Sequence, residues 1–313
     1  MSFVNSIGVI KVSNSKSRFG TRLEKIFFRG ILFLIKVLPF SWSRWFWKTI
    51  CSLAFRLLKP RRLLTIENIR NARERGFLTN VDDDYLLAKK AWENLGIVGS
   101  EFLYYSTRTG AQIKRLVTIE GEENLKKILA KKKGAVMVTG HLGNWELLGM
   151  ALSVYGYPLS PVVKTQANSS FDELINEKRH AIGMKTIPNK GFLRPIIDAF
   201  KRNEIVPFLI DQDAGGHGVK VECFGRKASI PPGAAEFALR TGTPAFFGYI
   251  YRKGINQYVG VISEEIQLKN SGDYKQDLHD NIALFMSLIQ DAVQKHPREW
   301  LWMHSLWPTK IKF

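Results

Sequence analysis

The stretch GAVMVTGHLGNWELLGMA, residues 134–151, reads as a strand, a tight exit and the start of a helix. Residues 135–139 are a short apolar run with β-branched members, which predicts a buried strand. A glycine follows the run and permits a sharp turn, and Asn144 has a side chain suited to a helix N-cap. This pattern places His141 at the carboxyl end of a strand and Glu146 in the first turn of a helix.

The same alternation of strand and helix continues on both sides of this stretch. Short apolar runs rich in β-branched and aromatic residues predict strands at 116–119, 135–139, 159–163, 205–210 and 245–251. Helical patterns predict helices at 124–131, 145–154, 170–182, 192–202, 234–240 and 277–295. The chain from residue 111 to 313 is therefore expected to form an α/β domain with helices packed on a sheet.

Composition excludes several classes of protein. With 313 residues and 45% hydrophobic residues, the chain has enough apolar surface for a core and is not a disordered chain. Only Cys51 and Cys223 are present, which excludes a disulfide scaffold and a cysteine-built zinc cluster. The first 25 residues lack the apolar region of a secretory signal peptide, so we expect a protein that faces the cytosol.

The positive charge is concentrated at the N-terminal end. Residues 1–80 hold 16 Lys and Arg against three Glu, and so carry +13 of the net charge of +18. A nucleic-acid-binding enzyme more often spreads basic residues over a groove of its folded domain. Here the charge lies on the most apolar and Trp-rich part of the chain, which favours a membrane surface over a nucleic acid.

Residues 26–58 are the predicted membrane-binding segment. Two apolar runs, 26–38 and 45–58, flank Pro39, and both are shorter than a spanning helix requires and are interrupted by basic residues. Tryptophans beside Lys and Arg suit a helix that lies in the membrane interface. A buried helical hairpin and a single tilted span over 26–42 remain alternatives. Two further helices are expected before residue 110, one ending at Gly76 and one starting at residues 82–84. The predicted division is thus a basic, helical, membrane-anchoring region, 1–110, and an α/β domain, 111–313.

His141 and Glu146 have the chemistry of an acid–base pair. Sheets of this kind bind ligands at the carboxyl ends of their strands. A neutral imidazole at that edge can take a proton from a hydroxyl, and a carboxylate can fix its tautomer. A histidine with only a structural role is the alternative. A metal pair is disfavoured because the sequence has no HExxH motif.

Several motifs in combination resemble one family, the bacterial lipid A late acyltransferases of the wider glycerolipid acyltransferase group. That group carries His-x4-Asp, and the lipid A branch carries His-x4-Glu, as in HLGNWE at 141–146. The resemblance covers about residues 25–305 and includes the blocks LP at 38–39, ENIR at 67–70, DQDAGG at 211–216, IPPGAA at 230–235 and LRTGTPA at 239–245. It implies a glycerolipid acyltransferase-like mixed sheet flanked by helices.

Two departures from the family concern the acceptor. The family's Tyr-Arg pair after the third strand is Val163-Lys164 here, and its carboxy-terminal Trp-x-His-Arg-Arg is WMHSL at 302–306. Both differences bear on how an anionic lipid is held, so the acceptor remains open.

The resemblance implies transfer of a fatty acyl chain from acyl carrier protein, or acyl-CoA, to a hydroxyl of a lipid A precursor in lipopolysaccharide biosynthesis. His141 would be the general base and Glu146 would orient it. No covalent enzyme intermediate and no cofactor or metal are needed, so both cysteines would be spectators. The oxyanion donor would be a backbone N–H near Gly140 or Gly143, or a cation such as Arg179 or Lys164.

The resemblance also implies substrate-binding residues: Arg179, Asp211, Asp213 and Lys164. Asp211 and Asp213 follow a predicted strand, where they would bond sugar hydroxyls or pair with Arg179; capping of a local turn is the alternative for them. The implied location is the cytoplasmic face of a bacterial inner membrane, with acidic acyl carrier protein and anionic lipid as partners.

Two other functions remain open. One is an acyltransferase that acts on another lipid, such as a phosphatidylinositol mannoside or an ornithine or glycerol lipid. The other is a non-catalytic, basic membrane-binding protein.

Overall fold

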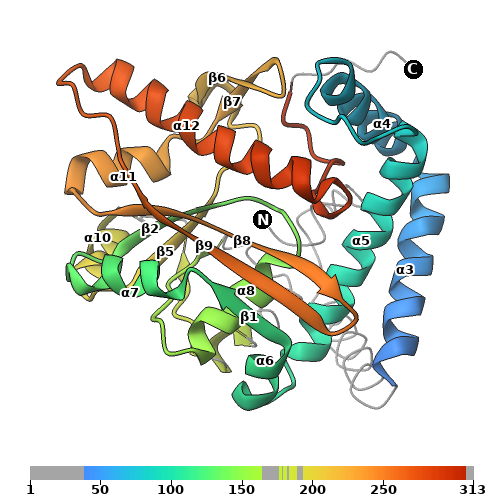
Figure 1. Cartoon of the computed structure of the whole chain (residues 1–313), viewed down its shortest axis with the longest axis horizontal. Helices are drawn as coiled ribbons and strands as arrows, with labels where there is room; N and C mark the ends of the chain where they lie inside the picture. Colours follow the sequence, from blue (N-terminus) through green and yellow to red (C-terminus); the bar gives the residue numbers. More distant parts are fainter. Residues whose placement is uncertain (1–38, 164–175, 178, 182, 189–192, 308–313) are drawn as a thin grey trace, which may run out of the picture.

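A mixed sheet runs through the middle of the molecule, with helices on both faces (Figure 1). In the described part of the chain, its strand order is β1 (Val117–Glu120), β9 (Gln257–Ile266), β8 (Ala245–Gly254), β2 (Ala135–Thr139) and β5 (Ile205–Leu209). Strand β2 is parallel to both of its neighbours, β8 and β5. Strand β1 is parallel to β9, and β8 and β9 form an antiparallel hairpin. The predicted α/β class with a mixed sheet is confirmed.

The computed structural model describes residues 39–163, 176–177, 179–181, 183–188 and 193–307. The predicted apolar run 26–38, the residue Lys164 and most of the predicted helix 170–182 lie outside these residues.

The predicted strands agree with β1, β2, β5 and β8 to within a few residues. The fifth, 159–163, is reduced to β3 (Val162–Val163), which pairs with β4 (Ile187–Pro188). Strand β9 and the hairpin of β6 (Val219–Cys223) and β7 (Arg226–Ile230) were not predicted. Their sequences mix polar and apolar residues, because one side of each of these strands is partly exposed.

The described helices match the predicted ones closely, except that the short helix at 110–116 was not predicted. They are α3 (Phe40–Leu57), α4 (Lys59–Glu74), α5 (Asp84–Tyr105), α6 (Gly110–Leu116), α7 (Glu122–Ala130), α8 (Trp145–Val154), α10 (Leu193–Lys201), α11 (Gly233–Thr241) and α12 (Tyr274–Lys295), with short 3₁₀ turns η1 (Gly215–His217) and η2 (Pro297–Glu299). Asp83 caps α5 by accepting the Leu86 N–H, and Asn144 caps α8 by accepting the Leu147 N–H. The three aspartates at 82–84 therefore lie at the start of a helix, as predicted.

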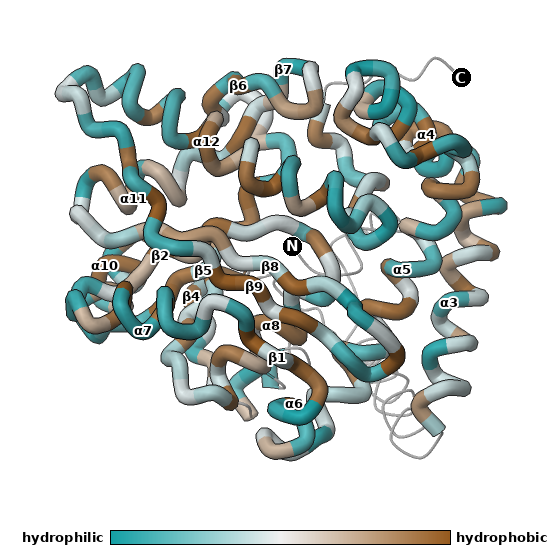
Figure 2. The backbone as a smooth tube through the Cα atoms, viewed as in Figure 1, coloured by the Kyte–Doolittle hydropathy of each residue, from teal (hydrophilic) through white to brown (hydrophobic). Residues whose placement is uncertain are grey.

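Strand β2 is buried on both faces, which explains its unbroken apolar sequence. Ala135 and Met137 belong to the core beneath α7 and α8, whereas Val136 and Val138 belong to the core with α11 and α12. In Figure 2, α12 carries hydrophobic and hydrophilic segments in alternation, as expected for a helix with one buried face.

Helices from the predicted N-terminal region share a core with the sheet. Phe55, Ile69 and Trp92 belong to the same buried cluster as Val138 and Phe285. Side chains from both predicted regions thus pack together in one core. The domain division at residue 110 stays a prediction. Within the described residues, no helix combines the length and apolarity needed to span a bilayer.

Candidate active site

Strand register brings His141 and Asp211 together. Thr139 of β2 lies opposite Leu209 of β5, and the two strands are parallel. His141 lies two residues after Thr139, and Asp211 lies two residues after Leu209. The two residues therefore lie side by side at the same edge of the sheet. This edge is the carboxyl end of both strands, where α/β proteins bind ligands.

The Asp211 carboxylate accepts three hydrogen bonds. One oxygen, Oδ1, lies 2.7 Å from Nδ1 of His141. The other, Oδ2, accepts the His141 backbone N–H at 2.6 Å and the Trp300 indole N–H at 2.8 Å. Both His141 and Asp211 are buried. A carboxylate facing Nδ1 places the imidazole proton on that atom, so Nε2 carries the lone pair that a general base requires.

The surroundings keep Asp211 ionised. Burial by itself would raise its pKa, but the charge of a protonated His141 and the hydrogen bonds from His141 and Trp300 outweigh burial. The pKa of Asp211 is therefore below its usual value, and the carboxylate can stabilise an imidazolium.

Two glycines make this arrangement possible. A Cβ at Gly140 would lie 2.9 Å from Oδ2 of Asp211. Gly143 has a φ of 62°, and a Cβ there would lie 1.8 Å from the carbonyl oxygen of Ile250. The loop between β2 and α8 can therefore pack against Asp211 and β8 only with glycine at these positions.

The C-terminal segment closes one side of the site. The Gly143 N–H donates to the Glu299 carbonyl, and the Leu301 N–H donates to the His141 carbonyl. His304 lies beyond, with its ring centroid 5.6 Å from that of His141. The altered motif at 302–306 thus lies beside the predicted base.

Glu146 lies in the first turn of α8, as predicted, but its carboxylate pairs with Arg179. Its carboxylate forms a bidentate ion pair with the Arg179 guanidinium, with one bond of 3.1 Å from Nε. The prediction that Glu146 orients His141 is therefore corrected: Asp211 holds His141 Nδ1, because β5 rather than α8 faces that nitrogen. Trp145, the neighbour of Glu146, contacts the His141 ring edge-on at 4.9 Å between centroids. The alternative pairing of Asp211 with Arg179 is likewise replaced by the Glu146–Arg179 pair.

Asp213 is in a different environment from Asp211. Its exposed carboxylate accepts the Gly215 N–H at 3.0 Å, which is the turn-capping arrangement considered as the alternative. A substrate role for Asp213 stays a prediction, as does one for Lys164.

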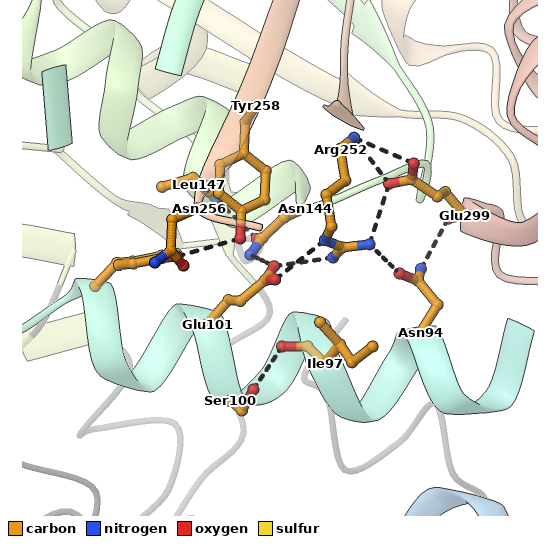
Figure 3. Close-up of polar contacts among 11 residues, drawn as sticks. Asn94, Ile97, Ser100, Glu101, Asn144, Leu147, Arg252, Asn256, Tyr258 and Glu299 are labelled. Atoms are coloured by element: carbon orange, nitrogen blue, oxygen red, sulfur yellow. Dashed lines mark hydrogen bonds and ion pairs between the residues drawn. The ribbon is translucent and has the colours of Figure 1, made fainter. Parts of the chain in front are cut away.

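A buried polar network supports the loop between β2 and α8 (Figure 3). Glu101 of α5 receives hydrogen bonds from the Asn144 amide at 3.0 Å and from the guanidinium of Arg252 on β8 at 3.0 and 3.2 Å. Arg252 also donates to the Asn94 side chain at 2.9 Å, and its backbone N–H donates to the Glu299 carboxylate. The network thus links α5, β8, the loop after β2 and η2.

Arg252 is the cation that two carboxylates of this network, Glu101 and Glu299, share. Burial disfavours the charged form of Arg252, but Glu101 and Glu299 outweigh burial and raise its pKa. Burial raises the pKa of Glu299, an effect that Arg252 opposes. No local sequence pattern indicated a role for Glu101, Arg252 or Trp300, because their partners are brought together only by the tertiary fold.

Both cysteines lie in the core. Cys51 and Cys223 are buried, and burial raises the pKa of both thiols. Neither thiol therefore has the thiolate character of a nucleophile.

The fold and site define an α/β protein with a buried His–Asp pair at the carboxyl edge of its central parallel strands. Residues 16–309 match the family model described as bacterial lipid A biosynthesis acyltransferase. The chain belongs to this family.

The chain is similar to curated relatives that carry two different names. A phosphatidylinositol mannoside acyltransferase of Mycobacterium tuberculosis is 29% identical over 128 residues, which is 40% of each chain. The lipid A biosynthesis palmitoleoyltransferase of Escherichia coli is 22% identical over 205 residues, which is 64% of each chain. The chain thus spans less than two thirds of the length of these relatives.

Proposed function

We propose that the protein is an O-acyltransferase that moves a fatty acyl chain from a thioester donor to a hydroxyl of a glycolipid. The observation that carries this proposal is the buried pair of His141 and Asp211, with the imidazole Nε2 left as a lone-pair acceptor. Family membership and the names of both kinds of relative support the same reaction class.

In this mechanism His141 acts as the base and Asp211 as its orienting partner. Nε2 of His141 takes the proton of the acceptor hydroxyl, whose oxygen attacks the thioester carbon. The Asp211 carboxylate stabilises the imidazolium that forms, and the imidazolium then protonates the departing thiolate. The neutral, buried thiols are not needed as nucleophiles.

Glu146 and Arg179 are proposed to bind substrate rather than move protons. Their side chains are only 19% and 16% exposed, and the pair lies one residue from the ring contact between Trp145 and His141. With Glu146 holding it, the guanidinium has a fixed orientation beside the base, where it suits a phosphate or carbonyl oxygen. Asp213 and Lys164 remain proposed acceptor contacts on the sequence resemblance alone.

The preferred acceptor is a lipid A precursor, and the runner-up is a phosphatidylinositol mannoside or related lipid. The family model favours the first, and the mycobacterial relatives favour the second. The proposed donor is acyl carrier protein or acyl-CoA. The net charge of +18 would steer an acidic carrier protein or a nucleotide phosphate towards the enzyme.

Membrane association is proposed to use α3. Its exposed apolar side chains follow helical spacing and form one stripe: Trp42, Trp45, Phe46, Ile50, Leu53 and Leu57. Trp42 and Trp45 are each 67% exposed and Leu57 is 71% exposed. Arg56 of the same helix, which is exposed, would contact anionic headgroups of the cytoplasmic leaflet of a bacterial inner membrane.

Lipid mass spectrometry of cells tests the reaction and its acceptor. Cells that lack the protein are compared with cells rescued by the wild type or by His141→Ala. Lipid A lighter by one acyl group, restored only by the wild type, is the expected result. Intact lipid A with another glycolipid under-acylated would select the runner-up. Unchanged lipids in all strains would contradict the enzyme and favour a non-catalytic membrane-binding protein.

Vesicle sedimentation tests the membrane surface. Trp42→Ser combined with Trp45→Ser should release the protein from vesicles that contain anionic lipid. The matched control is Tyr274→Ser, which removes an exposed aromatic ring from α12 instead. Equal binding by the α3 variant and the wild type would contradict the role proposed for this stripe.

A further inference from the structure

The Gln212 side chain occupies the position next to the proton-accepting atom of His141. Gln212 follows Asp211 directly, at the end of β5, and is half-buried. Its amide nitrogen lies 3.2 Å from Nε2 of His141 and 3.4 Å from Nε2 of His304. One amide group therefore bridges the two histidines beside the base.

The orientation of the amide follows from Asp211. Because the Asp211 carboxylate faces Nδ1, the His141 proton is on Nδ1 and Nε2 is an acceptor. An amide N–H can donate to that lone pair, whereas an amide oxygen would repel it. Burial lowers the pKa of His304, so His304 is neutral and its Nε2 can accept the second N–H.

The acceptor hydroxyl must occupy the position beside His141 Nε2 that the Gln212 amide occupies in this structure. To lose its proton, the hydroxyl oxygen must come within about 2.6–3.2 Å of Nε2. The Gln212 nitrogen is at that distance now, so the amide must rotate away when the hydroxyl arrives. The flexible side chain of Gln212 allows this rotation.

Three other donors near the base are already engaged. The His141 N–H donates to Asp211, the Gly143 N–H donates to the Glu299 carbonyl, and the Arg179 guanidinium is paired with Glu146. The backbone N–H groups of His141 and Gly143 are thus committed to structural contacts among the described residues, and Arg179, held by Glu146, is the residue proposed above to bind a substrate phosphate.

We propose that Gln212 donates a hydrogen bond to the oxyanion of the tetrahedral intermediate, with His304 as the residue that positions its amide. The inference rests on the proposed acyl transfer. As the hydroxyl oxygen bonds to the thioester carbon, its proton goes to His141 Nε2 and the carbonyl electron pair moves onto oxygen. The Gln212 N–H stabilises that charge. Collapse re-forms the carbonyl and breaks the C–S bond, and the thiolate takes the proton from His141.

The test uses Gln212→Met, which keeps the length of the side chain and removes its donor. With purified protein, acyl transfer and the hydrolysis of the acyl thioester by water are both measured. Loss of an oxyanion donor should lower kcat of both reactions about 10²–10³-fold, with little change in KM. Gln212→Glu should lower both at least as much, because a carboxylate repels the oxyanion. His304→Phe should lower both less, and should add little to Gln212→Met.

Three outcomes would overturn the role of Gln212. Faster hydrolysis in Gln212→Met would mean that the amide only obstructs the base. A higher KM for the acceptor with unchanged hydrolysis would mean that it only binds the acceptor. Full activity would mean that it does neither. Thermal unfolding of each variant separates these outcomes from misfolding. If the wild type neither transfers nor hydrolyses acyl groups, the proposed function fails instead.

Discussion

Replacing Asp211 by Asn removes the charge that holds His141 and keeps the shape of the side chain. The carboxylate accepts bonds from the His141 N–H, the His141 ring and the Trp300 indole at 2.6, 2.7 and 2.8 Å. An Asn amide can present one oxygen and one NH₂ group to these three donors. If the NH₂ group faces Nδ1, the ring proton moves to Nε2, and the base loses its lone pair.

The magnitude follows from this change of tautomer. In a Ser-His-Asp triad the same substitution lowers kcat about 10⁴-fold, so we expect a loss of about 10³–10⁴-fold here. This corresponds to about 4–5 kcal/mol of transition-state stabilisation. The unfolding free energy should fall by only about 1–3 kcal/mol, the usual cost of an unsatisfied buried hydrogen-bonding group.

Glu204→Gln is the matched control for Asp211→Asn. Glu204 is also buried and carboxylate-bearing, but it precedes β5 at the opposite end of the strand. Both proteins are assayed for acyl transfer and for thermal unfolding. Asp211→Asn should lose transfer and stay folded, while Glu204→Gln should keep its kcat and lose stability. The reasoning is refuted if folded Asp211→Asn retains more than a tenth of the wild-type rate.

Three further predictions concern the same elements. Burial would raise the pKa of Glu204, but hydrogen bonds from Arg202, Lys185 and Ser160 outweigh burial and lower the pKa to about 2. This shift stabilises the folded protein by about 2 kcal/mol after solvent screening. The stabilisation is complete above the unfolded pKa of about 4.3 and is lost as the pH falls through about 2. Acid unfolding of Glu204→Gln should therefore lack this contribution, and an unchanged profile would contradict it. Glu146→Gln and Arg179→Gln should each impair transfer, with a coupling of about 1–3 kcal/mol in a double-mutant cycle; additive effects would argue against the pair. Gly140→Ala should lower kcat about 100-fold in a folded protein, because its Cβ displaces the Asp211 carboxylate; kinetics like those of the wild type would exclude this contact.

The apolar strands and amphipathic helices were predictable because the local periodicity of hydrophobic residues reflects which side chains are buried. β2 is buried on both faces and reads as an unbroken apolar run, and α8 begins at the residue after its Asn144 cap. β9 was missed because it is partly exposed and mixes polar with apolar residues. Its pairing with both β8 and β1 makes it a central strand, and sequence pattern alone does not reveal that position.

Sequence motifs pointed to four of the residues described in the site, but not to their pairing or to Trp300. His141, Asp211, Glu146 and Arg179 were all identified, yet Glu146 was assigned the contact that Asp211 makes. The spacing of His141 and Glu146 gives only their separation in the sequence. It does not indicate which strand lies beside β2. Knowledge that β5 is the parallel neighbour of β2 would have been enough, because the register then aligns the two residues after each strand.

Single-turnover acyl transfer tests the central claim most directly. Wild type and His141→Ala, bound to identical vesicles that contain the acceptor glycolipid, are mixed with an acyl thioester, and the acylated lipid is measured over time. The account predicts transfer by the wild type, a loss of at least about 10³-fold in His141→Ala, and equal vesicle binding by both proteins. Transfer by His141→Ala at the wild-type rate would contradict it.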